Sequence, residues 1–250
     1  MPSILIFIIL GFFAQLIDGT MGMAYGVSSN TFLRSAGVPS AISSACVHVS
    51  EIFTTFISGL SHLKLKNVHK GLFFKLLLPG IIGGALGAYL RVEFESHILD
   101  IIIDLYLVVM GIIIVSKAFK KPEKPREFGN YAIGLGVAGG FTDAMGGGGW
   151  GPVVTSTLLA SGHDTRKTIG TVNTVEFFVT IAETTAFVAL LQDFRSYTSI
   201  ILGLIIGGVI AAPIGAYLCK IVPVKKMLLI VGLLVIFLNG WKLLQHAGLM

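Results

Sequence analysis

The stretch that decides the fold is Gly140-Phe141-Thr142-Asp143-Ala144-Met145-Gly146-Gly147-Gly148-Gly149-Trp150-Gly151-Pro152, a glycine run between two apolar segments. A related stretch, Gln15-Leu16-Ile17-Asp18-Gly19-Thr20-Met21-Gly22-Met23-Ala24-Tyr25-Gly26, lies near the start of the chain. Interrupted, glycine-rich segments at matching places in two halves of an apolar chain are typical of a membrane transporter's binding site. The two stretches are therefore the first candidates for a functional site.

The composition predicts an all-α, polytopic helical membrane protein. Of the 250 residues, 54% are hydrophobic and only 12% are charged, and the mean hydropathy is +0.87. Soluble domains carry about 25% charged residues. Several apolar runs approach or exceed the ~20 residues that a helix needs to cross a bilayer. Membrane β-barrels use short alternating segments instead, so this class is excluded.

The formal net charge of +5 does not indicate a nucleic-acid partner. The basic residues fall in short loops, where they orient membrane helices, and no basic patch is interleaved with aromatic residues. Both cysteines, Cys46 and Cys219, lie in apolar segments, so no disulfide is expected. Since His and Cys do not cluster in the sequence, we expect no metal and no cofactor.

The chain is an internal duplication. Five apolar segments precede a charged linker and five follow it, at Ser3–Ile17, Met23–Ala36, Pro39–His62, Gly71–Leu90, Ile98–Phe119, Tyr131–Thr142, Trp150–Ser161, Thr168–Leu191, Thr198–Leu218 and Val222–Leu244. An offset of 125 residues pairs Asp18 with Asp143 and Glu51 with Glu176, and an offset of 128 pairs the two Gly-Ala-Tyr-Leu sequences that begin at residues 87 and 215. We therefore expect a first membrane repeat at 1–119, a linker at 120–130 and a second repeat at 131–250.

The loop charges predict that the second repeat is inverted. Lys64, Lys66 and Lys70 follow the third segment of the first half, whereas the matching loop of the second half holds Asp193 and Arg195. The linker is basic, and positive loops stay cytoplasmic. An inverted repeat needs an odd number of membrane crossings in each half. The two segments around the glycine run have about 12 residues each, or roughly 18 Å of helix. They are too short to cross the ~30 Å hydrocarbon core comfortably. Each half is therefore predicted to contain a glycine-tipped re-entrant hairpin plus three spanning helices, or eight spans in total if hairpin arms cross.

The hairpin tips are predicted to bind an anion. Half-helices at membrane depth present free N–H groups and a positive dipole end, and glycine allows a ligand to approach the backbone. The expected contact residues are Thr20, Gly22, Gly26, Asn30, Thr142, Gly147, Gly148, Gly149, Thr171 and Asn173. Asp18 and Asp143 are expected to stabilise the tips, with a coupling-cation role left open. The alternative is that the glycines only permit close helix packing.

One glutamate in the third helix of each half is predicted to lie near the middle of the membrane. Ionisable groups at that depth are costly and are functional candidates by default. Glu51 shares a helix face with His48, and Glu176 is its counterpart in the second half. We expect these three residues to carry proton coupling or gating. The alternative is a neutral glutamate that hydrogen-bonds a hairpin, which we favour for Glu183, and Asp104 is interpreted as an interface charge.

Three motifs resemble those of a known family. They are Asp-x-x-x-Gly at each tip, Gly-Gly-Gly-Gly-Trp-Gly-Pro at 146–152, and Lys-Thr-Ile-Gly-Thr-Val-Asn-Thr-Val-Glu-Phe-Phe at 167–178. Together with the duplication they resemble the TauE/SafE permeases, also called the 4-toluenesulfonate uptake permease family. The resemblance implies a secondary transporter of sulfur-containing anions, such as sulfite, sulfoacetate, thiosulfate or organosulfonates, in a cell membrane.

We therefore expect a permease in the lipid bilayer of the cell membrane, with a cytoplasmic linker, a small sulfur-containing anion as substrate and protons as the coupling ion. A passive anion channel and a transporter of small carboxylate anions are the alternatives. An enzyme is not expected, because Ser44 and His48 lack a third residue to orient them. Homodimer formation is left open.

Overall fold

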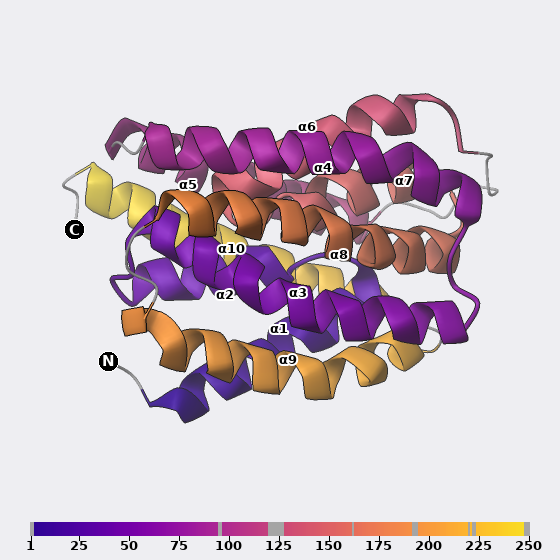
Figure 1. Cartoon of the computed structure of the whole chain (residues 1–250), viewed down its shortest axis with the longest axis horizontal. Coiled ribbons are helices and arrows are strands. Elements are labelled where there is room, and N and C mark those ends of the chain that lie inside the picture. Colours follow the sequence, from indigo (N-terminus) through magenta and orange to yellow (C-terminus); the bar gives the residue numbers. More distant parts are fainter. Residues whose placement is uncertain are drawn as a thin grey trace.

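In the computed structural model, residues 3–94, 97–119, 128–161, 163–191, 195–219, 221 and 224–247 are described. All the regular elements in these ranges are helices (Figure 1). They are α1 (Ile4–Met21), α2 (Tyr25–Ser35), α3 (Ser40–Lys64), α4 (Lys70–Glu93), α5 (His97–Lys117), α6 (Tyr131–Gly146), the π-helical turn η1 (Gly151–Thr155), α7 (Ser156–Ala160), α8 (Thr165–Leu190), the 3₁₀ turn η2 (Arg195–Tyr197), α9 (Thr198–Leu218) and α10 (Val224–His246).

The predicted all-α membrane class is confirmed. Five helices of the described part are long and apolar enough to span a bilayer, namely α1, α3, α4, α8 and α9. The helices α5 and α10 include residues whose side chains are not described, so they do not enter that set. Most of the linker, residues 120–127, lies outside the described ranges.

The first arm of each glycine hairpin is longer than the sequence predicted. We expected these arms to end at Ile17 and Thr142, but α1 continues to Met21 and α6 to Gly146. Each helix ends only where a glycine adopts φ +66°, a left-handed conformation typical of helix C-termini. The N–H groups of these glycines, Gly22 and Gly147, donate to the carbonyls of Asp18 at 2.5 Å and Asp143 at 2.7 Å. The two tips therefore share one geometry.

The two halves interlock. Each first arm packs mainly on a long helix of the other half, α1 on α9 and α6 on α4. The helices α3 and α8 pack on each other, as do α5 and α10. Because the repeat relates α1 to α6 and α4 to α9, these are the pairings that a two-fold relation between the halves would produce. Three long helices, α3 to α5, separate the two hairpins in the chain. Because three is an odd number, the second hairpin would enter the helix bundle from the end opposite to the first. The inverted orientation in a bilayer remains a prediction.

Glycines permit the close approach of the interlocked helices. A Cβ atom on Gly207 of α9 would lie 2.0 Å from the carbonyl oxygen of Ile8 in α1. At the equivalent crossing, a Cβ atom on Gly83 of α4 would lie 2.2 Å from the carbonyl oxygen of Val137 in α6. Small residues at such crossings allow the backbones to pack without a side chain between them. These glycines therefore position both hairpins.

Candidate functional site

The two hairpin tips touch each other in the interior of the protein. A Cβ atom on Gly26 would lie 2.7 Å from the Cα atom of Gly148, and one on Gly148 would lie 2.1 Å from the backbone nitrogen of Val27. Gly148 also has φ +153°. Across the same contact, the Thr155 hydroxyl donates to the carbonyl of Gly22 at 2.5 Å. Only glycine fits at positions 26 and 148, because the backbones themselves are in contact.

Each tip is closed by its own aspartate. Asp143 Oδ1 accepts hydrogen bonds from the N–H groups of Gly149 at 2.7 Å and Trp150 at 3.0 Å. In the first half, the Asp18 carboxylate accepts a hydrogen bond from the backbone N–H of Tyr25. Both aspartates are buried. Three of the free N–H groups that we expected to face an anion are therefore already bonded to a carboxylate.

Polar side chains from α2 and α3 bind the end of α6. Asn30 Nδ2 donates to the carbonyl of Gly146 at 2.6 Å, and Ser43 donates to Asn30 Oδ1 at 2.5 Å. Ser44 donates to the carbonyl of Ala144 at 3.1 Å. The last carbonyls of a helix have no partner within the helix, so these groups supply it. The end of the second hairpin is thus held by residues of the first half.

A buried histidine joins two carboxylates beside the tips. His48 Nδ1 lies 2.8 Å from Glu51 Oε2 and 3.1 Å from Glu183 Oε2. One N–H can donate to only one acceptor at a time, and both Glu183 oxygens lack a hydrogen-bond partner among the described residues. The ring of Phe187 stacks on His48 with centroids 5.7 Å apart. Since ligand-type atoms of His48, Glu51 and Asp143 lie within 4.8 Å of one another, these side chains have a spacing that could hold a metal ion.

Five buried carboxyl groups interact at this centre. Glu176 interacts electrostatically with the other four, which are Asp18, Glu51, Asp143 and Glu183. Isolated charges in an apolar interior are strongly unfavourable, and like charges at short range add to that cost. A single histidine cannot neutralise five carboxylates. Most of the cluster is therefore neutral at any moment, or a bound cation balances its charge.

The structure brings part of the predicted anion site together. Gly22, Gly26, Gly147, Gly148 and Gly149 converge at the tip contact. Asn30 lies beside them, and a Cβ atom on Gly26 would be 3.3 Å from Glu51 Oε1. Thr142 also lies close, since a Cβ atom on Gly149 would be 2.6 Å from its hydroxyl oxygen.

Four predicted donors bond elsewhere. The Thr142 hydroxyl donates to the carbonyls of Ala138 at 2.8 Å and Gly139 at 3.1 Å in its own helix. The Thr20 hydroxyl donates to the carbonyl of Leu16 at 2.6 Å. Thr171 donates to the carbonyl of Lys167 at 2.5 Å and accepts from the N–H of His69 at 2.8 Å, in the loop before α4. Asn173 Nδ2 donates to the carbonyl of Ile169 at 3.3 Å, and its Oδ1 accepts from Ser58 at 2.7 Å. An anion contact by any of these groups would require it to exchange a bond.

Sequence reasoning missed three members of the site. Glu183, for which we favoured a neutral glutamate hydrogen-bonded to a hairpin, lies against His48. Its position seven residues after Glu176 places both on one helix face. Ser43 donates to Asn30 in the hairpin of its own half, and Thr155 donates to the opposite hairpin. No pattern in the sequence distinguishes these two residues from the neighbouring polar residues.

The two halves differ in charge around the centre. The repeat pairs His48 with Asn173 and Glu183 with Ser58. Two equivalent contacts between α3 and α8 result. Glu183 approaches His48 on one side, and Ser58 donates to Asn173 Oδ1 on the other. One side of the centre therefore carries ionisable groups and the other carries their neutral counterparts.

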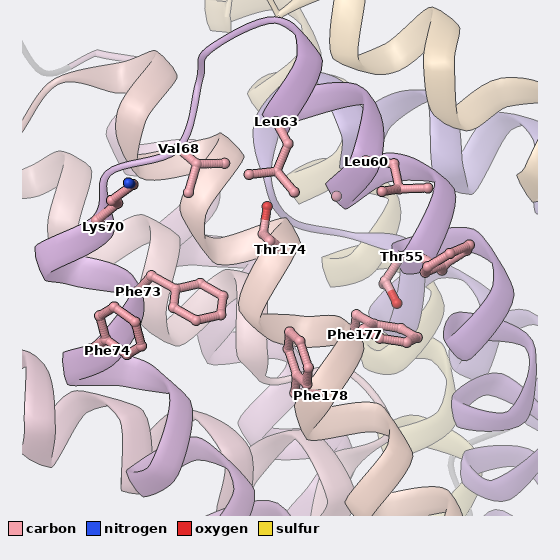
Figure 2. A pocket seen from close by; sticks show the side chains of 12 residues that line it. Thr55, Leu60, Leu63, Val68, Lys70, Phe73, Phe74, Thr174, Phe177 and Phe178 are labelled. Atoms are coloured by element: carbon pink, nitrogen blue, oxygen red, sulfur yellow. The ribbon is translucent and has the colours of Figure 1, made fainter.

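A cavity of about 430 Å³ lies away from the tips, between α3, α4 and α8 (Figure 2). Five phenylalanines dominate its lining, and its polar members include Thr55, Thr174 and Lys70. Several lining side chains also reach the outer surface, among them Phe74, which is 70% exposed. An apolar wall offers few donors to a small anion, so we do not assign the anion site to this cavity.

Comparison with known proteins agrees with this architecture. The family model described as "Sulfite exporter TauE/SafE" matches residues 7–241. A relative from Bacillus subtilis (strain 168), "Probable membrane transporter protein YtnM", is 38% identical over an alignment that covers 98% of this chain and 84% of the relative. No solved structure matches the chain. The chain therefore belongs to the TauE/SafE sulfite exporter family of membrane transporters.

Proposed function

We propose that this transporter moves a small sulfur-containing anion across the cell membrane together with protons. Sulfite, thiosulfate and organosulfonates are the candidate substrates, because the family is described as a sulfite exporter family. The observation that carries the proposal is the contact of two glycine tips beside five buried carboxyl groups. Broken hairpins that meet at a buried ionisable centre are the usual construction of a coupled transport site.

The substrate contacts in this proposal lie at the tips. The buried backbone at Gly26 and at Gly147 to Gly149, with the amide of Asn30 and the hydroxyl of Thr142, would provide the donors. In this structure the N–H groups of Gly149 and Trp150 are bonded to the Asp143 carboxylate, and those of Gly147 and Gly148 are bonded to its main-chain carbonyl. The two bonds to the carboxylate depend on its charge. When Asp143 is protonated, its hold on these N–H groups weakens, and an anion can take its place as their acceptor. Neutral donors and helix ends then hold the anion without any lysine or arginine.

The carboxyl cluster supplies the coupling. An anion that approaches charged carboxylates in a low-dielectric interior is repelled, whereas it meets no such repulsion when they are protonated. Protons and the anion therefore favour each other's binding, which is reciprocal by thermodynamic linkage. Glu51 lies beside the tip contact, where a Cβ atom on Gly26 would be 3.3 Å from its Oε1, and is the proposed proton carrier, with His48 as its partner. Glu176 is proposed as a second carrier or gate.

Reconstituted transport tests this function. A gradient of one pH unit is worth about 1.4 kcal/mol per proton and supports up to about tenfold accumulation of a coupled anion. Proteoliposomes with an acidic exterior and a clamped membrane potential should therefore concentrate labelled thiosulfate or sulfoacetate. Glu51→Gln should abolish accumulation, while Glu93→Gln, an exposed glutamate at the end of α4, should retain it.

The same assay separates the alternatives. Equilibration without accumulation in the unmodified protein would indicate a passive anion channel. Accumulation of lactate in preference to every sulfur-containing anion would indicate a carboxylate transporter. Full gradient-driven uptake by a variant that combines Glu51→Gln with Glu176→Gln would contradict the proton-carrier assignment.

A further inference from the structure

The cavity between α3, α4 and α8 combines an apolar interior with a basic edge. Its volume of about 430 Å³ falls in the range of small-molecule sites, roughly 300–1,000 Å³. Figure 2 shows phenylalanine side chains from all three helices around it, with Lys70 and Val68 at one edge. The cavity opens on a surface that faces lipid in a membrane protein, because Leu60, Leu63 and Phe74 are 40%, 49% and 70% exposed. A ligand for this site needs an apolar body.

The aromatic wall is continuous across the helices. Phe56 of α3 packs on Phe177 of α8 with ring centroids 5.2 Å apart. Phe73 of α4 packs edge-on against Phe178 of α8 at 5.9 Å. The phenylalanine rings therefore form the walls of a narrow slot between the helices. An acyl chain, which is long, thin and flexible, matches such a slot.

Positive charge gathers at one end of the slot. Lys70 is exposed and lines the cavity. The ammonium group of Lys167 lies 3.3 Å from the carbonyl oxygen of Val68, another lining residue. Lys64 and Lys66 are exposed in the same α3–α4 region. Lysines at the end of membrane helices attract anionic lipid headgroups, each contributing about 1 kcal/mol.

Comparison of the two halves shows that the fold does not require this construction. The repeat pairs Phe56, Phe73 and Phe74 with Ile181, Ile201 and Leu202. It also pairs Phe177 with Ile52, and Lys70 with Thr198. The equivalent surface of the other half is therefore mainly aliphatic and lacks the lysine, although it packs the corresponding helices. Apart from Phe178, whose counterpart is Phe53, the aromatic lining and its basic edge therefore occur at only one of the two related surfaces.

We propose that this cavity is a binding site for an anionic phospholipid, with one acyl chain between the phenylalanine rings and the phosphate beside Lys70. The site shares two helices with the functional centre, because Thr55 at the cavity lies one turn after Glu51 in α3 and Phe177 follows Glu176 in α8. Bound lipid therefore contacts the two helices that carry the buried carboxyl groups. The inference does not depend on the identity of the transported anion.

Lipid-dependent stability and native mass spectrometry of the purified full chain test this site. Phosphatidylglycerol should bind and raise the midpoint of thermal unfolding, and phosphatidylcholine should do so less. Lys70→Gln should weaken phosphatidylglycerol binding about fivefold, the equivalent of one lysine contact, and leave phosphatidylcholine binding unchanged. Lys226→Gln, an exposed lysine on α10, is the matched control and should keep the difference between the two lipids.

Blocking variants test the position of the acyl chain. Leu63→Trp should fill the slot and remove the phosphatidylglycerol effect, whereas Val188→Trp, at the paired position and 53% exposed, should retain it. Leu60→Trp serves the same purpose if Leu63→Trp does not fold. Equal binding of both lipids to the unmodified protein and to Lys70→Gln would overturn the proposal, as would undiminished binding to the blocked variants. Displacement of phosphatidylglycerol by a lower concentration of an alkyl sulfonate would also overturn it, since the slot would then take an amphiphilic substrate.

Discussion

At the scale of single residues, the two aspartates and the glycines that follow them decide the shape of each tip. Asp143 replaces the missing helical acceptors of Gly149 and Trp150, and the glycines bring the two backbones into contact. These roles are distinct, because the aspartate satisfies donors whereas the glycines provide space. Substitutions of Asp143 and of Gly148 test these two roles separately.

Asp143→Ala should destabilise the protein more than loss of an ordinary helix cap. It would leave two buried N–H groups without acceptors, each worth about 1–3 kcal/mol. Asp164→Ala is the matched control, because Asp164 accepts from the N–H of Lys167 at 2.8 Å in an exposed helix cap, worth about 1 kcal/mol. Thermal unfolding in one detergent should show the larger decrease for Asp143→Ala. Equal decreases would mean that water or a neighbour replaces the aspartate.

Gly148→Ala should prevent normal assembly of the tips. The added Cβ atom would overlap the backbone of Val27, and the positive φ adds strain of about 1–3 kcal/mol. Gly134→Ala is the control, because no atom lies within 4 Å of the Cβ position in that helix, and alanine is favoured there by about 0.5–1 kcal/mol. The yield of monodisperse protein and its unfolding midpoint measure both effects. Normal yield and stability of Gly148→Ala would contradict the tip contact.

At the scale of elements, a buried ion pair connects α2, the second arm of the first hairpin, to α5, and a histidine extends this contact to α10. Arg34 near the end of α2 lies 2.5 Å from Asp104 of α5, and both side chains are buried. His246 of α10 lies 3.2 Å from the second oxygen of Asp104. The sequence of α5 predicted an interface charge at Asp104 but did not reveal the buried arginine that faces it.

A double-mutant cycle measures the interaction between Arg34 and Asp104. Arg34→Gln should cost about 3–5 kcal/mol, because it leaves a buried carboxylate without its main partner. Asp104→Asn added to Arg34→Gln should recover part of that loss, because two neutral groups can hydrogen-bond each other. Chemical unfolding of the four proteins gives the coupling energy. Strictly additive losses would show that the two side chains do not depend on each other.

At the scale of the whole molecule, each half covers apolar surface of the other. The hairpin helix α1 packs mainly on α9 and α6 on α4, so neither half has a complete interior by itself. The repeats at 1–119 and 131–250 are units of sequence, whereas the packed unit contains both.

Separate expression of the halves tests the interlocked packing. Residues 1–119 or 131–250 produced alone should aggregate or be degraded, because the partner helices of α1 and α6 are absent. The two pieces produced together should copurify as a one-to-one complex and recover gradient-driven uptake. Size-exclusion chromatography gives the outcome. A stable, monodisperse half produced alone would contradict the packing.

Much of the architecture could be predicted because its signals are local or repeat at a regular offset. Long apolar runs predict the spanning helices, and paired glycines and aspartates identify the two tips. The helix ends were predicted several residues early, at Ile17 and Thr142, because Asp18 and Asp143 were expected to stabilise the tips rather than to lie within the helices. In the structure they still belong to α1 and α6. The turn begins only at Gly22 and Gly147, where a left-handed conformation costs glycine little.

The sequence by itself determined the membrane class, the duplication and the identity of most groups at the centre, because hydropathy and residue type are properties of each position. Only the tertiary structure decided which of these groups meet. Glu183 joins His48, Asn30 holds the end of α6, and Thr171 turns to the loop before α4. Such contacts join residues more than one hundred positions apart and depend on helix crossings within a few ångströms. Those crossings are determined by which glycines face which backbone, and this is a property of the packed helices rather than of any one segment.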